Sequence, residues 1–331
     1  MKRVNLAMQG GGAHGAFGWG ILDRLVEEER LDIEGLSASS SGSMNAVVYA
    51  AGRMRGGRAG AREALEKFWR SVSVAGMAYM PGFLWFQNLS GAFSPAQLNP
   101  FGLNPLRDLV KDNIDLDAVR ACTAVELFLC ATNVGSGQPR IFRNAEITLD
   151  VLMASACLPS LFPAVEIGGQ HYWDGGYMGN PALYPLIYNT AARDIVIVHI
   201  NPIVRPQVPR SAAEIQNRLN EITFNSSLLR ELRAIAFVTK LIEQGWLKEQ
   251  YQDKLKHVLI HSIRADAAMS ELGVSSKLNT DWGFLCELRD RGRDAASVWL
   301  EANFEHLGER STVDLQSEFL APALSPSAGA G

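Results

Sequence analysis

A glycine run at residues 10–15, Gly-Gly-Gly-Ala-His-Gly, constrains the fold of this chain most. It follows the short apolar segment 4–8 and precedes residues 16–29, where apolar side chains recur with helical spacing. A second apolar segment, 33–38, leads into the serine turn 39–42 and a further predicted helix. This order of strand, turn and helix is typical of a parallel α/β sheet, in which the loops at the carboxyl ends of the strands carry the chemistry.

The rest of the chain continues the α/β pattern. Residues 124–134 and 195–201 are dense in apolar and β-branched side chains, which predicts interior strands. Residues 214–245 and 281–307 place apolar side chains three or four positions apart, which predicts long amphipathic helices. We therefore expect a mostly parallel central sheet followed by C-terminal helices.

Charge and composition exclude several classes of partner. The formal net charge is -4 and both signs are interspersed, so we expect no nucleic-acid partner. The four cysteines lack metal-ligand spacing and are expected to be reduced. The N-terminal segment is too short for a secretory signal, and no window approaches the roughly 18 apolar residues of a membrane span. These features predict a cytoplasmic chain that reaches a membrane only by transient contact with its surface.

The glycine loop has two interpretations. Its spacing matches the G-x-G-x-x-G of a dinucleotide-binding loop, which requires an acidic residue at the carboxyl end of the second strand. Asp32 and Glu34 lie at the start of that strand instead. The other interpretation is an oxyanion hole, in which backbone N–H groups and the following helix stabilise developing negative charge. Its residues are Gly10, Gly11, Gly12 and Ala13.

The serine turn favours the second interpretation. A nucleophile elbow needs small residues two positions before and two positions after the nucleophile. Within the turn only Ser40 has a glycine, Gly42, two positions after it and a residue no larger than alanine, Ala38, two positions before it. The alternative is an ordinary serine N-cap of a helix, since serine is a preferred cap.

A candidate base lies much later, where an apolar segment ends in Asp174-Gly175-Gly176. The turn would project the Asp174 carboxylate from the edge of the sheet. An Asp-Gly turn is more often structural, so its weight comes from the other two motifs.

Together these elements resemble the patatin-like phospholipases, whose pattern is a G-G-G-x-[K/R/H]-G loop, a G-x-S-x-G elbow and a D-G-[G/A] turn. Ala38 stands in place of the first elbow glycine, and Ser39 and Ser41 in place of the usual Thr and Ala. The resemblance covers about residues 4–200 and extends through Met44-Asn45-Ala46, Ala131-Thr132-Asn133, Gly137, Phe142, Ala154-Ser155-Ala156-Cys157-Leu158-Pro159 and Phe162-Pro163.

The resemblance implies a hydrolase of acyl esters in phospholipids or related lipids, with Ser40 as nucleophile, Asp174 as base and no histidine, metal or cofactor. A carboxylate is a weak base for an alcohol, so the site must raise the pKa of Asp174 by burial. The implied fold is a patatin-like three-layer α/β sandwich. We expect a catalytic domain at 1–205, a helical C-terminal extension packed on it at 206–320, and a disordered tail at 321–331.

Two other functional readings stay open. A Ser-Asp-His esterase would draw its histidine from those that follow Asp174 in the chain. A catalytically inactive fold used for binding is the alternative from another class. The candidate histidines are His199, His257, His261 and His306. We expect His14 to orient the glycine loop and His171 to be a solvated neighbour of the strand.

Residues 72–105 form a long apolar segment interrupted by Gly and Pro, with no helical or strand period. It is either an irregular wall of the core or a lid that contacts lipid near Trp85 and Phe86.

Overall fold

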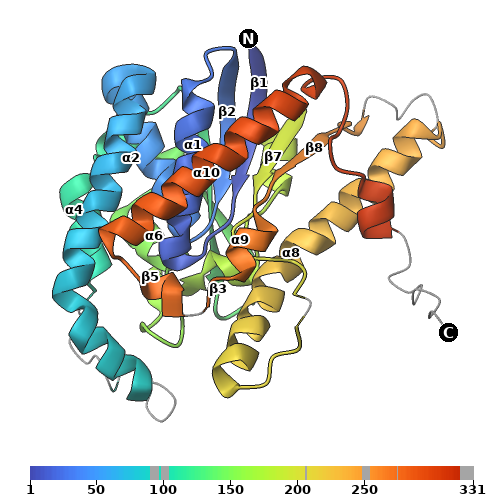
Figure 1. Cartoon of the computed structure of the whole chain (residues 1–331). Helices are drawn as coiled ribbons and strands as arrows, with labels where there is room; N and C mark the ends of the chain where they lie inside the picture. Colours follow the sequence, from blue (N-terminus) through green and yellow to red (C-terminus); the bar gives the residue numbers. More distant parts are fainter. Residues whose placement is uncertain (90–96, 98–103, 206, 248–253, 274, 321–331) are drawn as a thin grey trace.

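The structure is a computed structural model that describes residues 1–89, 97, 104–205, 207–247, 254–273 and 275–320. A central sheet of mostly parallel strands carries helices on both faces (Figure 1), which confirms the expected α/β sandwich with C-terminal helices. The strands are β1 (Lys2–Met8), β2 (Leu31–Ala38), β3 (Glu126–Asn133), β4 (Pro139–Arg143), β5 (Val165–Ile167), β6 (Gln170–Asp174), β7 (Asp194–Val198) and β8 (Leu259–Ile263).

Helices connect these strands and cover the sheet. The longer helices are α1 (Gly15–Glu27), α2 (Ser41–Leu89), α4 (Pro105–Asn113), α5 (Leu116–Arg120), α6 (Leu149–Ser155), α7 (Tyr184–Asn189), α8 (Ala212–Glu243), α9 (Asp266–Ser270) and α10 (Trp282–Asn303). The short helical turns are η1 (Gly12–His14), η2 (Asn144–Glu146), η3 (Gly175–Tyr177), η5 (Ser275–Leu278), η6 (Phe304–His306) and η7 (Gln316–Leu320).

Within the described residues the strands form one sheet in the order β5-β6-β3-β2-β1-β7-β8, with β4 also paired to β3. The pairs β3–β2, β2–β1, β1–β7 and β7–β8 are parallel. The pairs β3–β4, β3–β6 and β5–β6 are antiparallel. Strand β7, which lies between β1 and β8, is buried along its whole length, which explains the apolar run Ile-Val-Ile-Val after Asp194.

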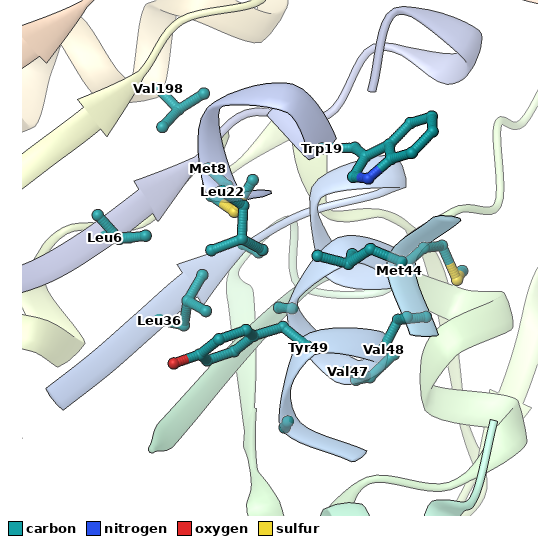
Figure 2. Packing of buried hydrophobic residues seen from close by; sticks show 14 of the residues in the cluster. Leu6, Met8, Trp19, Leu22, Leu36, Met44, Val47, Val48, Tyr49 and Val198 are labelled. Atoms are coloured by element: carbon teal, nitrogen blue, oxygen red, sulfur yellow. The ribbon is translucent and has the colours of Figure 1, made fainter. Parts of the chain in front are cut away.

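The main core lies between the sheet and the helices α1 and α2. Side chains from β1 and β2 meet side chains from both helices in Figure 2. The residues labelled in that view are Leu6, Met8, Trp19, Leu22, Leu36, Met44, Val47, Val48, Tyr49 and Val198. The sheet positions of this group are fully buried. The core therefore holds the carboxyl ends of β1 and β2, and with them the two motif loops, in place.

The C-terminal part of the chain belongs to the same body. Helix α10 crosses α1 at two glycines, because a Cβ on Gly20 would lie 1.9 Å from the carbonyl oxygen of Arg289 and one on Gly292 2.1 Å from that of Phe17. Strand β8 pairs with β7. Residues 206–320, expected to be a helical extension, thus also supply a strand of the central sheet.

The expectation of irregular structure from residue 72 onward is wrong as far as Leu89. The chain there continues α2, whose only non-helical residues are Gly56 and Gly57. Gly and Pro lower helix propensity without preventing a helix, because each affects only its own turn. The side chains of residues 77–89 lie outside the described residues, as do residues 90–96, 98–103 and the tail 321–331, so the lid and the disordered tail remain predictions.

No helix in the described part of the chain is both long enough and apolar enough to cross a membrane.

Candidate active site

Ser40 occupies a strained turn between β2 and α2. Its φ of 54° makes it the one non-glycine residue with left-handed backbone among the described residues. A Cβ on Gly42 would lie 2.7 Å from the carbonyl oxygen of Met8, so the small residue that the elbow requires is enforced by the end of β1. Ala38 is fully buried. The turn therefore has the tight strand-to-helix geometry that exposes a nucleophile.

Ser155, at the end of α6, holds this turn. The Ser40 N–H donates to both the carbonyl oxygen and the Oγ of Ser155, each at 3.1 Å. The Ser155 hydroxyl donates to the Cys130 carbonyl at 2.7 Å and lies 2.9 Å from Ser43 Oγ. The sequence placed Ser155 within the family resemblance but assigned it no role.

The register of β3 brings Asp174 to the elbow. Residues 126–129 of β3 pair with β2, while Ala131 pairs with Asp174 at the end of β6. Strand β4 pairs with one edge of β3 along residues 128–132. On the opposite edge, β2 pairs with residues 126–129 and ends before Ser40, and β6 then pairs with residues 131–133. The Asp174 N–H also donates to the Cys157 carbonyl at 2.8 Å, so residues 155–157 bind both turns.

The Asp174 carboxyl is fully buried, and burial raises its pKa to about 7. Hydrogen bonding to the Gly176 N–H, 2.7 Å from Oδ1, and to the Ser40 hydroxyl opposes this rise in pKa by favouring the charged form. The second oxygen, Oδ2, has no partner of good hydrogen-bond geometry among the described residues. The Ser40–Asp174 contact is therefore loose, as catalytic hydrogen bonds often are without substrate.

The glycine loop offers fewer free donors than expected. The Gly10 N–H donates to Asn180 Oδ1 at 2.7 Å and the Gly11 N–H to Ser41 Oγ at 3.0 Å. Gly12 and Ala13 begin the turn η1, where the first N–H groups have no partner within the helix. These two N–H groups are therefore the loop donors left for an oxyanion.

A buried amide network supports the loop from below. Asn201 Nδ2 donates to the Gly10 carbonyl at 2.8 Å, and Gln9 Oε1 accepts the N–H groups of Ile200 and Asn201. Gln9 Nε2 donates to Asn225 Oδ1 at 2.9 Å. Sequence reasoning missed these residues and Asn180, because an isolated Asn or Gln carries no motif.

Ser40 opens into an apolar cavity of about 320 Å³. Asp174 lies behind Ser40 and does not line the cavity. The lining combines the two motif loops with α2, the segment after α6, α8 and η5: Gly11, Gly12, Ala13, Ser40, Ser41, Met44, Phe68, Trp69, Val72, Leu106, Ala156, Leu158, Ser160, Leu161, Phe162, Asn220, Phe224, Lys277, Leu278 and Thr280. Residues beyond 205 thus complete the cavity wall, and no sequence motif indicates that contribution.

The four histidines that follow Asp174 in the chain and were candidates for a Ser-Asp-His site have their contacts away from Ser40 and Asp174. His261 contacts Asp194 and Thr312, His257 contacts Arg193 and Glu243, and His306 contacts Arg310. Burial lowers the pKa of His199 to about 3, and neither ring nitrogen has a partner among the described residues. None of these contacts involves Ser40 or Asp174.

His14 couples the glycine loop to η5. Its Nε2 lies 2.8 Å from Ser276 Oγ, and burial together with nearby Lys277 and Arg205 lowers its pKa to about 3. The ring is therefore neutral at neutral pH and contacts η5 through Ser276, and its orienting role stays a prediction. His171 is an exposed neighbour of Glu166 on the next strand.

No group of three metal-ligating side chains occurs within the described ranges. All four cysteines are unpaired.

Comparisons with known proteins find one matching family model, two curated relatives and a similar solved structure. A family model described as "Patatin-like phospholipase" matches residues 6–187, more than half of the chain. Two curated relatives, each "Lysophospholipase NTE1" from a strain of Cryptococcus neoformans var. neoformans serotype D, are 25% identical over 215 residues. That match covers 61% of this chain but only 11% of those proteins.

One solved structure, the crystal structure of VipD from Legionella pneumophila, resembles the chain with a TM-score of 0.42 and 14% sequence identity. The likeness covers 91% of this chain and 67% of that one.

Proposed function

The chain belongs to the patatin-like phospholipase family, and from that premise we propose that it hydrolyses acyl esters of lipids with Ser40 as nucleophile and Asp174 as general base. The observation that carries this proposal is the relative position of Ser40, the apolar cavity and the Asp174 carboxyl. A strained serine faces an apolar cavity, with a buried carboxyl whose pKa is about 7 directly behind it.

The reaction would proceed in two halves. Ser40 Oγ attacks the ester carbonyl while Asp174 takes the hydroxyl proton, and the Gly12 and Ala13 N–H groups stabilise the oxyanion. Asp174 then returns the proton to the leaving alcohol. Water, deprotonated by Asp174, releases the acyl group from Ser40. A pKa near 7 suits both directions of this proton transfer at neutral pH.

The cavity supports a substrate with an acyl chain. Its wall is largely apolar, with Phe68, Trp69, Leu161 and Phe224 among the lining residues. An apolar chain gains about 0.8 kcal/mol for each buried CH₂ group, so such a wall favours long acyl esters. We propose a phospholipid or lysophospholipid as the substrate class.

An exposed apolar stripe supports contact with a membrane surface. Ile215, Leu219 and Ile222 recur on one face of α8 and expose 44%, 53% and 51% of their surface. On the same helix, Asn220 and Phe224 line the catalytic cavity. Figure 1 shows this first half of α8 beyond the carboxyl ends of the strands. The stripe lies roughly half a turn around α8 from these two residues, so it faces away from the cavity and is free to contact a lipid surface.

Ser40→Ala tests the nucleophile. The variant should lose labelling by a fluorophosphonate and all hydrolysis of lysophospholipid and p-nitrophenyl esters, while its unfolding curve stays close to that of the wild type. Ser136→Ala, in an exposed turn, is the matched control and should keep both.

Retained turnover in Ser40→Ala would overturn the assignment. Loss of activity in His199→Ala or His261→Ala, with normal folding, would favour the Ser-Asp-His mechanism instead.

A further inference from the structure

A cluster with excess positive charge borders the catalytic cavity. Glu221 is bound by Arg205 at 2.7 Å and by Arg218 at 3.2 Å, and Lys277 is close enough to interact with it electrostatically. Within the described residues, these three cations share one carboxylate. When all three are protonated, the cluster has two positive charges in excess of its one carboxylate.

Lys277 is the cation of this cluster that lines the cavity. Arg205 and Arg218 also donate to backbone carbonyls, including those of Ser270 and Ile203. The Lys277 ammonium has one acceptor among the described residues, Asn201 Oδ1 at 3.1 Å. An ammonium has three N–H donors, so two remain for a ligand.

Burial of Lys277 is unfavourable for its charged form. Desolvation lowers the pKa of the ammonium, and the nearby Glu221 carboxylate only partly opposes this effect. A bound anion would supply the missing countercharge and acceptors.

The backbone of Lys277 fixes this charge beside the oxyanion loop. A Cβ on Gly12 would lie 2.4 Å from the Lys277 carbonyl oxygen, so the two backbones are in contact. Through Asn201, the ammonium is also linked to the Gly10 carbonyl. An anion at Lys277 would thus lie close to the ester carbonyl held by Gly12 and Ala13. In a glycerophospholipid only the glycerol carbons separate the phosphate from the acyl esters.

We propose that Lys277, with Asn201 beside it, binds the phosphate of a glycerophospholipid head group and so selects phospholipids over neutral acylglycerols. The inference rests on the proposed lipid hydrolase function, which it makes more specific. Lys277 is a specificity residue in this scheme, since it contacts the head group and not the reacting atoms.

Two substrates with the same acyl chain isolate this role: 1-palmitoyl-lysophosphatidylcholine and 1-monopalmitoylglycerol, both in mixed detergent micelles. Lys277→Gln should lower kcat/KM for the lysophospholipid by about 10- to 100-fold, the effect expected for loss of a charged hydrogen bond. Turnover of the monoacylglycerol, which carries no phosphate, should fall by a clearly smaller factor. Lys277→Arg, which keeps the charge, should retain the preference for the lysophospholipid.

Lys256→Gln is the matched control, because Lys256 is a half-buried lysine that donates to the Thr190 carbonyl away from the cavity. It should leave both substrates unaffected. If Lys277→Gln lowers turnover of both substrates by the same factor, Lys277 supports the oxyanion loop and the head-group assignment is overturned. An unchanged substrate preference overturns it as well.

Binding separates this inference from the proposed function. Calorimetric titration with a non-hydrolysable ether lysophospholipid should show about 10- to 100-fold weaker binding to Lys277→Gln, with no change for the phosphate-free alkylglycerol. That result decides the role of Lys277 even if the wild type cleaves no ester. Inorganic phosphate alone should bind far more weakly than the ether lipid, and equal affinity would assign the site to free phosphate instead.

Discussion

Replacing Asp174 by Asn should abolish hydrolysis and yet make the folded chain more stable at neutral and alkaline pH. The Asp174 carboxyl is fully buried, so its ionised form is unfavourable in the folded protein. An Asn side chain has nearly the same shape and no charge to bury. Its amide oxygen can still accept the Gly176 N–H that now donates to Oδ1.

The magnitude follows from the pKa of Asp174 in the two states. The carboxyl ionises near its ordinary pKa of 3.8 in the unfolded chain and near a pKa of about 7 in the folded chain. Between these pH values the folded chain holds a proton that the unfolded chain has released, so wild-type stability falls as pH rises. About three pH units at about 1.4 kcal/mol each give a loss on the order of 4 kcal/mol, complete above about pH 7. The free energy of unfolding of Asp174→Asn should not fall in this way, because the Asn side chain does not ionise.

Denaturant unfolding of both proteins between about pH 4 and about pH 9 measures the difference. The advantage of Asp174→Asn should grow with pH and level off above about pH 7, while wild-type kcat/KM rises over the same range as the base ionises. Asp112→Asn, at an exposed position, is the control and should show no such trend. A pH-independent difference, or a variant that retains turnover, would refute the reasoning.

Two further predictions concern the surface and the core. Leu219→Ser combined with Ile222→Ser should reduce hydrolysis of phospholipid in vesicles by about tenfold or more, because two half-exposed apolar side chains are lost. Hydrolysis of a monomeric short-chain ester should not change. Equal losses on both substrates would contradict membrane contact through α8. Gly292→Ala should lower the free energy of unfolding by more than about 2 kcal/mol, because its Cβ would lie 2.1 Å from the Phe17 carbonyl oxygen. Gly56→Ala, whose Cβ meets nothing within 4 Å, is the control, and equal stability of the two variants would show that α1 and α10 can move apart.

The sequence alone predicted the features that depend on local backbone requirements. A strained turn needs small neighbours, and Ala38 and Gly42 predict such a turn at Ser40, whose φ is 54°. Apolar periodicity likewise predicted α1, the central strands and the long helices α8 and α10, because burial on one face or two imposes a repeat on the residue types. Irregularity after residue 72 was predicted wrongly, since Gly and Pro weaken a helix without excluding it.

Only the tertiary structure decided how these local features combine. Asp174 reaches Ser40 because β6 takes the edge of β3 that β2 leaves, a consequence of strand register that no local pattern encodes. The Gly10 and Gly11 N–H groups are taken by Asn180 and Ser41, so the choice of oxyanion donors depends on competing acceptors distant in sequence. Burial of Asp174 raises its pKa, and the fold carries Lys277 from the C-terminal segment to the cavity wall. Residue types set what each turn can do, whereas hydrogen-bond competition and desolvation depend on neighbours that only folding brings into contact.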